Sequence, residues 1–103
     1  MSTKRTSLPR MADYTKAFIK DWQRLTHSGR YNMKQLKEAM LLLIANDEPL
    51  PAEWLDHALV GEWVDHRECH IGGDFLLIYR LEKQGKQELI IFTRTGTHAE
   101  LFE

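Results

Sequence analysis

Hydrophobic residues at helical spacing dominate the first part of the chain. They recur at three- and four-residue steps: Met11, Tyr14, Phe18, Trp22 and Leu25. This spacing predicts one apolar stripe on a helix over residues 11–27. The pair Ser28-Gly29 is a typical helix stop and predicts that the helix ends there.

A second stripe of the same period predicts another helix from about Asn32 to Ala45. Its apolar members are Met33, Leu36, Met40 and Leu43. Asn32 is a favourable N-cap, and Gln35 occupies the capping-box position three residues later. Because the connection is short, the two helices are expected to form an antiparallel hairpin.

The second half of the chain has the shorter period of strands. Three strands are predicted, at Trp63–Ile71, Phe75–Leu81 and Glu88–Arg94. The sequence Gly72-Gly73-Asp74 is a tight turn, and residues 83–87 form a longer one. No crossover helix separates these strands, so they form an antiparallel meander covered on one face by the helical hairpin, an α+β arrangement.

The remaining segments have weaker signals. Residues 46–59 read as a loop that Trp54 and Leu55 anchor, and residues 1–10 as an irregular start with a short strand near Lys4 to Leu8. At the other end, Thr97 and Glu100 match a capping box, which predicts a one-turn helix beginning at His98. On local pattern alone, that helix is explained equally well by simple packing of Leu101 and Phe102 into the core.

Composition fits one domain over residues 1–103. The single cysteine, Cys69, excludes an internal disulfide and fits a reducing compartment. The basic N-terminus lacks the apolar region of a secretory signal, and the longest apolar stretch, Met40 to Ala45, is too short to span a membrane. We therefore expect a cytoplasmic protein.

The net charge of −1 conceals two halves of opposite sign. Residues 1–45 hold nine Lys/Arg and three Asp/Glu, whereas residues 46–103 hold five Lys/Arg and twelve Asp/Glu. A polyanionic partner would be attracted to the first half. On charge patterns alone, two solvated faces of opposite sign are the favoured explanation.

Three histidines are the main candidates for chemistry: His57, His70 and His98. They lie before the predicted sheet, at the end of one strand and just after another, and imidazole can give and take a proton at neutral pH. Asp74, in the turn, could act as a base or orient a histidine. Arg67 and Arg94 could each hold a phosphate through two parallel hydrogen bonds.

A metal site is the alternative interpretation of the residues in this region. His66 and His70 lie two positions apart on one predicted strand, with His57 and Cys69 nearby in sequence. However, Cys69 points away from these histidines by strand alternation, and no HExxH or CxxC spacing occurs. We expect no metal and no cofactor, and we expect Cys69 to be a small buried residue.

Three separated blocks of the sequence resemble the YafQ branch of the RelE/ParE toxin superfamily. The first runs from Pro49-Leu50-Pro51 through Asp56-His57 to Gly61-Glu62-Trp63, and the second from Arg67 through His70 and Asp74 to Tyr79. The third, Arg94-Thr95-Gly96-Thr97-His98-Ala99-Glu100-Leu101-Phe102, is the closest. The likeness covers residues 11–103.

The resemblance implies a bacterial type II toxin that cleaves mRNA in the ribosomal A site without a cofactor. It implies a RelE-like fold, ribosomal RNA contact and a cognate antitoxin that holds the toxin inactive. The catalytic residues of the family fall on His57, His70, Asp74, Arg94 and His98. Its terminal aromatic falls on Phe102, and we add Arg67 and Phe75 as candidate substrate contacts. We assign ribosome contact to the basic stripe: Lys16, Lys20, Arg24, Lys34 and Lys37.

The sequence departs from the family pattern at two points. Phe75 stands where the family has a tryptophan, and the chain is slightly acidic although ribosome-binding toxins tend to be basic. Two alternatives therefore stay open. One is a non-catalytic inhibitor of DNA gyrase, as in the ParE branch, and the other is an inactive relative that only binds an antitoxin.

Overall fold

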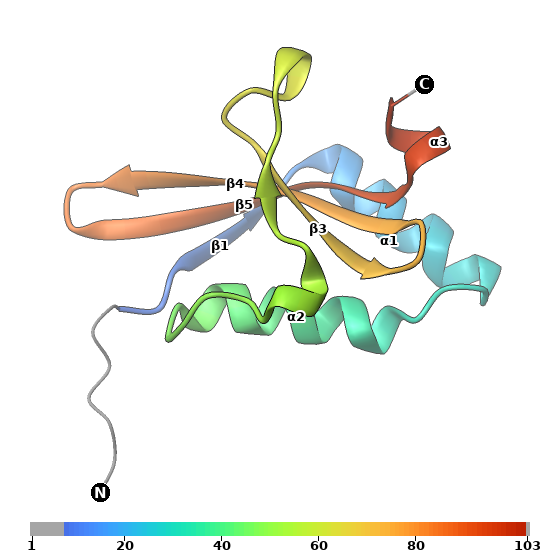
Figure 1. Ribbon diagram of the computed structural model, residues 1–103, viewed down its shortest axis with the longest axis horizontal. Coiled ribbons are helices and arrows are strands. Elements are labelled where there is room, and N and C mark those ends of the chain that lie inside the picture. The colour runs from blue at the N-terminus through green and yellow to red at the C-terminus, as the bar shows by residue number, and fades with distance from the viewer. Residues whose placement is uncertain (1–7, 103) are drawn as a thin grey trace, which may run out of the picture.

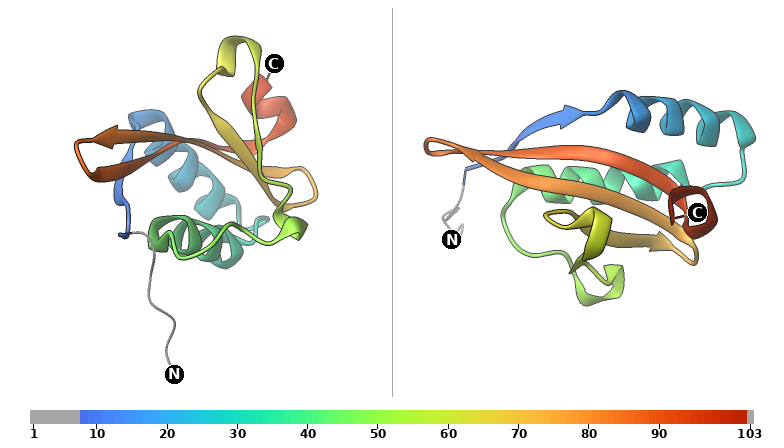
Figure 2. Two further views of the ribbon diagram at one scale, coloured as in Figure 1. Left: turned by 60° about the vertical axis from the view of Figure 1, so that its left-hand side comes forward. Right: turned by 90° about the horizontal axis from the view of Figure 1, so that it is seen from above.

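The computed structural model describes residues 8–102. In chain order its elements are β1 (Met11–Tyr14), α1 (Lys16–Ser28), α2 (Met33–Ala45), the 3-10 turn η1 (Ala52–Trp54), β2 (His57–Ala58), the 3-10 turn η2 (Gly61–Trp63), β3 (Arg67–Gly72), β4 (Phe75–Gln84), β5 (Gln87–Thr97) and α3 (His98–Phe102). The long helices cover one side of the sheet, and α3 lies near its β3–β4 turn (Figures 1 and 2). Within the described span, no helix is long and apolar enough to cross a membrane.

The five strands form one sheet in the order β1-β5-β4-β3-β2. The predicted meander is confirmed, because β3, β4 and β5 pair antiparallel in sequence order. The sheet as a whole is mixed, since β1 pairs parallel with β5 along residues 11–14 and 89–92. The α+β class is confirmed with this one parallel edge strand added.

The prediction of helix over Met11–Tyr14 is wrong, because Thr15 caps the helix after this segment. The Thr15 hydroxyl accepts a hydrogen bond from the Phe18 amide at 2.9 Å, so α1 begins at Lys16. Tyr14 still packs its ring on Phe18, with centroids 5.6 Å apart, but it does so from a strand. Leu8 lies outside any strand, and residues 4–7 of the strand expected near Lys4 to Leu8 fall outside the described residues.

The second helix begins and ends as expected. The Asn32 side chain accepts from the Gln35 amide at 2.9 Å, which confirms the predicted N-cap. The Gln35 side chain accepts from the Asn32 side-chain amide at 3.2 Å rather than from the Asn32 backbone N–H that a capping box would use. Asn46 takes the left-handed conformation after the last turn, with φ of 55°, and its amide bonds to the Leu42 carbonyl. The two helices run in opposite directions beside the sheet (Figure 2).

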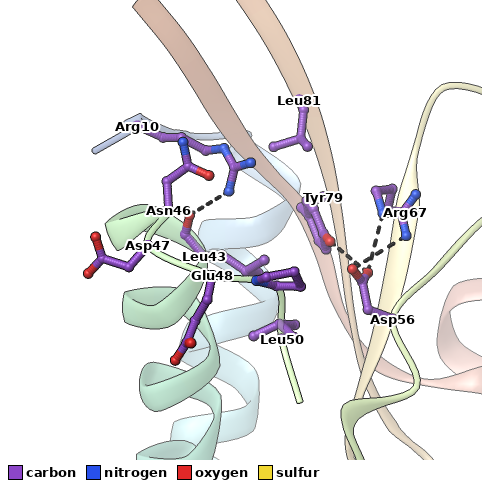
Figure 3. Close-up of a pocket in the computed structure, with 11 residues that line it drawn as sticks. Arg10, Leu43, Asn46, Asp47, Glu48, Leu50, Asp56, Arg67, Tyr79 and Leu81 are labelled. Carbon is purple, nitrogen blue, oxygen red and sulfur yellow. Dashed lines mark hydrogen bonds and ion pairs between the residues drawn. The ribbon is translucent and has the colours of Figure 1, made fainter. Parts of the chain in front are cut away.

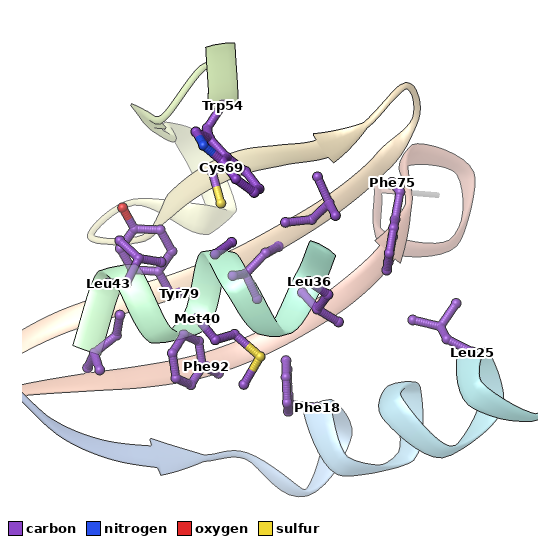
Figure 4. Close-up of a cluster of buried hydrophobic side chains, with 14 residues drawn as sticks. Phe18, Leu25, Leu36, Met40, Leu43, Trp54, Cys69, Phe75, Tyr79 and Phe92 are labelled. Atoms are coloured by element: carbon purple, nitrogen blue, oxygen red, sulfur yellow. The ribbon is translucent and has the colours of Figure 1, made fainter. Parts of the chain in front are cut away.

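Two apolar clusters lie on opposite faces of the sheet. The larger one packs both long helices on the sheet through residues that include Phe18, Leu36, Tyr79 and Phe92 (Figure 4). Cys69 lies in it and is fully buried, which raises the pKa of its thiol. The smaller cluster, on the other face, joins Leu76, Ile78 and Leu101 and fixes α3 there. The sheet face opposite the long helices therefore carries α3 and the side chains around it.

A β-bulge in β5 decides which side chains reach that second face. Tyr79 pairs with Phe92, whereas Ile78 pairs with Arg94, so Thr93 is an extra residue. Side chains two positions apart normally share a face, and Arg94 would then lie with Phe92 against the helices. Because of the bulge, Arg94 instead lies opposite Ile78 on the face that carries α3.

The first predicted strand is too long at its start. β3 begins at Arg67, and Trp63 belongs to the turn η2. Asp65 has a positive φ of 72°, and the His66 amide bonds to the Trp63 carbonyl at 3.0 Å, so the backbone turns here. His66 therefore precedes the strand and does not share the strand alternation with His70.

The two faces of α2 provide a stability test of this packing. Leu36 is 0% exposed and Leu41 is 66% exposed on the same helix. Leu36→Ala should lower the free energy of unfolding by about 2–5 kcal/mol, because it leaves a cavity between helix and sheet. The matched change Leu41→Ala should alter it by less than about 0.5 kcal/mol in urea denaturation. Equal effects of the two changes would contradict the assigned burial.

Candidate active site

Three histidine rings from three elements meet on the face that carries α3. The ring centroids of His57 and His70 are 6.0 Å apart, and those of His70 and His98 are 6.3 Å apart. Strand pairing explains the approach: His57 lies opposite Glu68 next to β3, and Phe75 lies opposite Thr97, which brings the start of α3 to the β3–β4 turn. The predicted convergence of the histidines is present.

His98 is oriented by Asp74. One carboxylate oxygen of Asp74 lies 2.8 Å from His98 Nδ1 and accepts the His98 backbone N–H at 3.2 Å. These hydrogen bonds from the His98 ring and backbone lower the pKa of Asp74, so the carboxylate is ionised at neutral pH. Since an ionised carboxylate only accepts, Nδ1 carries the proton and Nε2 is left to face a substrate.

The segment before His98 is fixed by the predicted capping box. The Thr97 amide donates to the Glu100 carboxylate at 2.8 Å, and the Glu100 amide donates to the Thr97 hydroxyl at 3.3 Å. Gly96 has a φ of 154°, and a Cβ there would lie 2.6 Å from the Glu100 carboxylate. Glycine at this position thus lets the cap close directly over the strand end.

Arg94 lies on the same face but is held by a residue that the sequence analysis did not identify. Its Nε and Nη2 donate to the two carboxylate oxygens of Asp21 on α1 at 2.7 and 3.0 Å. Asp21 is 2% exposed and also accepts the Thr95 amide at 3.1 Å. Within the described residues, Arg94 Nη1 keeps its donors for a phosphate.

One signal in the sequence could have revealed Asp21. It lies three residues after Phe18 and four before Leu25, which places a carboxylate on the apolar stripe of α1. A charged residue on a buried stripe needs a partner of opposite charge. The helical periodicity predicts the apolar stripe, and the one carboxylate within that stripe, Asp21, is the signal that indicates a buried ion pair.

Aromatic rings extend the site beyond His98. Phe102 packs against His98 with centroids 5.4 Å apart, and Trp63 meets Phe102 edge-on at 5.9 Å. His66 also packs edge-on against Trp63, with ring centroids 5.3 Å apart. Phe102 is 39% exposed, so it can contact a substrate as the sequence analysis expected.

Two candidate substrate contacts lie on the opposite face of the sheet. Phe75 is 5% exposed and packs on Tyr31 in the larger core, so its ring is not available to a substrate at the histidines. Arg67 lines a separate cleft of about 360 Å³ and lies 3.4 Å from Asp56, which also accepts the Tyr79 hydroxyl at 2.6 Å (Figure 3). Both residues face the helical side because of strand alternation.

A model of the family described as the bacterial toxin of type II toxin–antitoxin system, YafQ, matches residues 10–103. The chain belongs to the YafQ family. It is 41% identical over 95 residues to the mRNA interferase toxin YafQ of Escherichia coli K12, across 92% of this chain and 98% of that protein.

Two solved structures in this fold are informative. The E. coli DinJ–YafQ complex contains a chain 41% identical to this one, with a TM-score of 0.78 over 91% of this chain and 99% of that one. A metal-bound toxin from Helicobacter pylori is 35% identical, with a TM-score of 0.77 over 90% of this chain and 99% of that one. The RelE-like α+β fold expected from the resemblance is thereby confirmed.

The YafQ-like site contains one group of side chains that fits a metal ion. His57, Glu68 and His70 each offer a ligand atom, and these atoms lie within 4.8 Å of one another. His57 Nδ1 donates to the Leu55 carbonyl at 2.7 Å, while its Nε2 lies 3.3 Å from the Glu68 carboxylate. Either a proton or a metal ion between His57 Nε2 and the Glu68 carboxylate would give both groups a bonding partner. Two imidazoles and a carboxylate suit divalent transition metals.

Sequence alternation alone did not bring these three residues together. It correctly placed Glu68 and His70 on one face and Cys69 on the other, but His57 joins them through β2, a strand that was predicted as loop. His66, the other histidine of the alternative considered, packs on Trp63 instead.

The basic residues assigned to ribosome contact are exposed on the two long helices. Lys16 and Lys20 lie on α1, and Lys34 and Lys37 lie on α2. Arg24 continues the α1 row at four-residue spacing, and its guanidinium contacts both Asp21 and Glu100 of α3, at 2.9 and 3.3 Å. The basic row of α1 thus ends beside the histidine site.

Asp21→Asn tests the role of the buried carboxylate in stability. Burial alone would raise the pKa of Asp21, but hydrogen bonds from Arg94, Arg24 and the Thr95 amide outweigh it and lower the pKa. The ionised carboxylate therefore stabilises the fold above the unfolded pKa of about 3.9, and this stability is lost as the pH falls through the folded pKa. The change should lower the free energy of unfolding at pH 7 by about 3 kcal/mol.

The difference between wild type and Asp21→Asn should shrink below about pH 4, as followed by urea denaturation across pH. Asp13→Asn is the matched control, because Asp13 is exposed and, within residues 8–102, its side chain accepts only the neighbouring Tyr14 amide. A pH-independent difference would show that the charge of Asp21 is not what stabilises the fold.

Proposed function

We propose that this chain is an endoribonuclease toxin that cleaves mRNA in the A site of the translating ribosome. The observation that carries the proposal is the position of His98. It is oriented by an ionised carboxylate, lies 6.3 Å from a second histidine ring, and shares a sheet face with Arg94. Its 41% identity to an E. coli mRNA interferase supports the same activity.

The proposed reaction uses the message itself as the nucleophile. The ribose 2′-oxygen forms a bond to the adjacent phosphorus, and the bond from phosphorus to the 5′-oxygen of the next nucleotide breaks. A base accepts the 2′-hydroxyl proton, and His98, which enters this step as an imidazolium protonated at both ring nitrogens, donates its Nε2 proton to the leaving 5′-oxygen. The products are a 2′,3′-cyclic phosphate and a 5′-hydroxyl. Side chains alone balance these proton transfers.

The other residues are assigned by their contacts. His70 is the favoured base, because Asp74 is already bonded to His98 and its lowered pKa makes it a weak proton acceptor. His57 lies beyond His70 and tunes it through Glu68, which lies 3.3 Å from both rings. Arg94 stabilises the charge that develops on the phosphoryl oxygens, and Phe102 supports or stacks on a base.

Two partners follow from this proposal. The exposed lysines of the long helices contact ribosomal RNA, which positions the toxin over the message in the cytoplasm. An antitoxin covers the basic surface and holds the toxin inactive, as DinJ accompanies YafQ in the E. coli complex.

His98→Ala should reduce the single-turnover rate of message cleavage on translating ribosomes by about 10²- to 10⁴-fold, because the leaving oxygen loses its acid. His27→Ala is the control, since His27 is exposed at the end of α1. An undiminished rate in the His98 variant would remove it from the mechanism. Inhibition of DNA gyrase supercoiling without RNA cleavage would support the ParE-like alternative instead.

The metal-ligand geometry suggests that divalent metals regulate this site. Zn²⁺ or Cu²⁺ held by His57, Glu68 and His70 would occupy Nε2 of the proposed base and inhibit cleavage. Glu68→Gln should weaken binding by at least the roughly 10–100-fold seen for changes around metal sites, whereas Glu53→Gln in η1 should not. Equilibrium dialysis measures binding, and cleavage with added metal measures inhibition. Wild type that binds no metal, or binds it without inhibition, would refute this regulation.

A further inference from the structure

A second cleft opens on the histidine face between the η2 loop and α3. It has a volume of about 730 Å³ and is lined by Val60, Glu62, Trp63 and His66 around η2, by Thr93 of β5, and by Leu101 and Phe102 of α3. This size is within the range of pockets that bind small ligands. The cleft lies on the same sheet face as the histidines, because Leu101 packs on Leu76 and Ile78 of that face.

The rings of the cleft suit a flat, aromatic ligand. Two rings contact Trp63 nearly perpendicularly, Phe102 at 72° and His66 at 89°. These contacts fix the indole and leave part of it and of Phe102 accessible. Base–aromatic stacking is the main way in which proteins hold unpaired nucleotides.

The loop that carries Trp63 is set in place before any ligand binds. Its backbone makes hydrogen bonds from Val64 to Gly61 at 3.1 Å and from His66 to Trp63 at 3.0 Å. The Leu59 amide closes the loop onto the His66 carbonyl at 2.9 Å. Because the loop is already ordered, ligand binding in the cleft loses little conformational entropy of the loop.

Phe102 connects the cleft to the proposed reaction. Its ring contacts Trp63 in the cleft and also His98, with centroids 5.9 and 5.4 Å away. A nucleotide whose phosphate lies at His98 thus has its base at the mouth of the cleft. Because Phe102 joins the cleft to His98, a nucleobase of the RNA substrate is the ligand that this cleft would bind.

Glu62 is the one acidic residue among those that line the cleft. An ionised carboxylate accepts hydrogen bonds and donates none. Adenine, cytosine and guanine carry exocyclic amino groups that can donate to it, whereas uracil has no amino group and its single N3–H lies between two carbonyl oxygens, which a carboxylate repels. A carboxylate also repels the RNA backbone, so its gain in this cleft comes from contact with a base edge.

We propose that this cleft binds the nucleobase adjoining the scissile phosphodiester and that Glu62 favours an amino-bearing base over uracil. The proposal rests on the endoribonuclease function proposed above. It names the substrate contact that gives the same site its sequence preference.

The first test compares ribosome-bound messages that differ only in one base beside the cleavage site. Wild type should cleave amino-bearing bases faster than uracil at one position, and Glu62→Gln should reduce that ratio by about five- to tenfold, the size expected when a charged hydrogen bond is replaced by a neutral one. Asp65→Asn is the matched control. It removes the same charge from the same loop, outside the cleft lining, and asparagine tolerates the positive φ of 72° there.

A uniform change of all rates in the Glu62 variant, equal to that in the Asp65 variant, would overturn the proposal, because it would show only weaker repulsion of the backbone. If wild type cleaves no message, the proposed nuclease function fails. The second test then decides the cleft separately, since it requires no cleavage.

The second test uses non-cleavable 2′-O-methyl trinucleotides at millimolar concentration and the three indole N–H signals in NMR spectra. Trp63 should shift on titration, with larger shifts for adenine-containing than for uridine-only trinucleotides. Trp22 and Trp54 pack against the opposite core and should not shift. Trp63→Phe assigns the signal. An unshifted Trp63, or equal shifts of all three signals, would overturn binding in the cleft.

Discussion

A single buried carboxylate, Asp21, connects the helical layer to the strand that carries the site. It accepts hydrogen bonds from Arg94, from the Thr95 amide and from Arg24, at 2.7 to 3.1 Å. A buried carboxylate is costly unless it is paired, and two guanidiniums and a backbone N–H offset that cost. Because Arg24 also reaches Glu100, which closes the cap over His98, the position of α1 is coupled to the position of the proposed acid.

One face of the sheet packs against the long helices and forms the main core, and the other face carries the residues of the proposed reaction. Leu77, Tyr79 and Phe92 point to the long helices, whereas Leu76 and Ile78 support α3. The bulge at Thr93 is what allows one strand to serve both functions, since it turns Arg94 away from the core that Phe92 fills. Without the extra residue, Arg94 would share the helical face with Phe92 and would point away from the histidines.

The fold could be predicted from the sequence where the hydrophobic periodicity and the capping residues indicated the same helix or strand. Asn32, Thr97 and Glu100 made correct caps because capping is local, and the strand meander followed from short connections. Met11–Tyr14 could not be predicted as a strand, because Tyr14 and Phe18 keep a helical spacing and the parallel partner lies almost eighty residues away. Thr15, an N-cap residue type, was the local signal that marked the true start of the helix.

The site was predictable in its residue types and less so in its pairings. The convergence of His57, His70 and His98 followed from strand ends, and the resemblance named Asp74 and Arg94 with them. Asp21 was missed because its partner is on another element, and Phe75 and Arg67 were expected at the site although strand alternation places them on the other face. Side-chain type indicates available chemistry, whereas the face of a sheet decides whether residues meet.

Charge around the site explains why the ribosome matters to the proposed mechanism. Glu68 and Asp74 contact the histidines, and Glu62 lines the adjoining cleft. The guanidiniums of Arg94 and Arg24 already share the Asp21 carboxylate. Among the described residues, this site therefore has little positive potential with which to collect free RNA by itself. The exposed lysines lie instead on the long helices, where they can contact a larger polyanion. A site of this kind gains its substrate by being positioned on a surface that already holds the message, so orientation on the ribosome replaces direct electrostatic capture of the RNA.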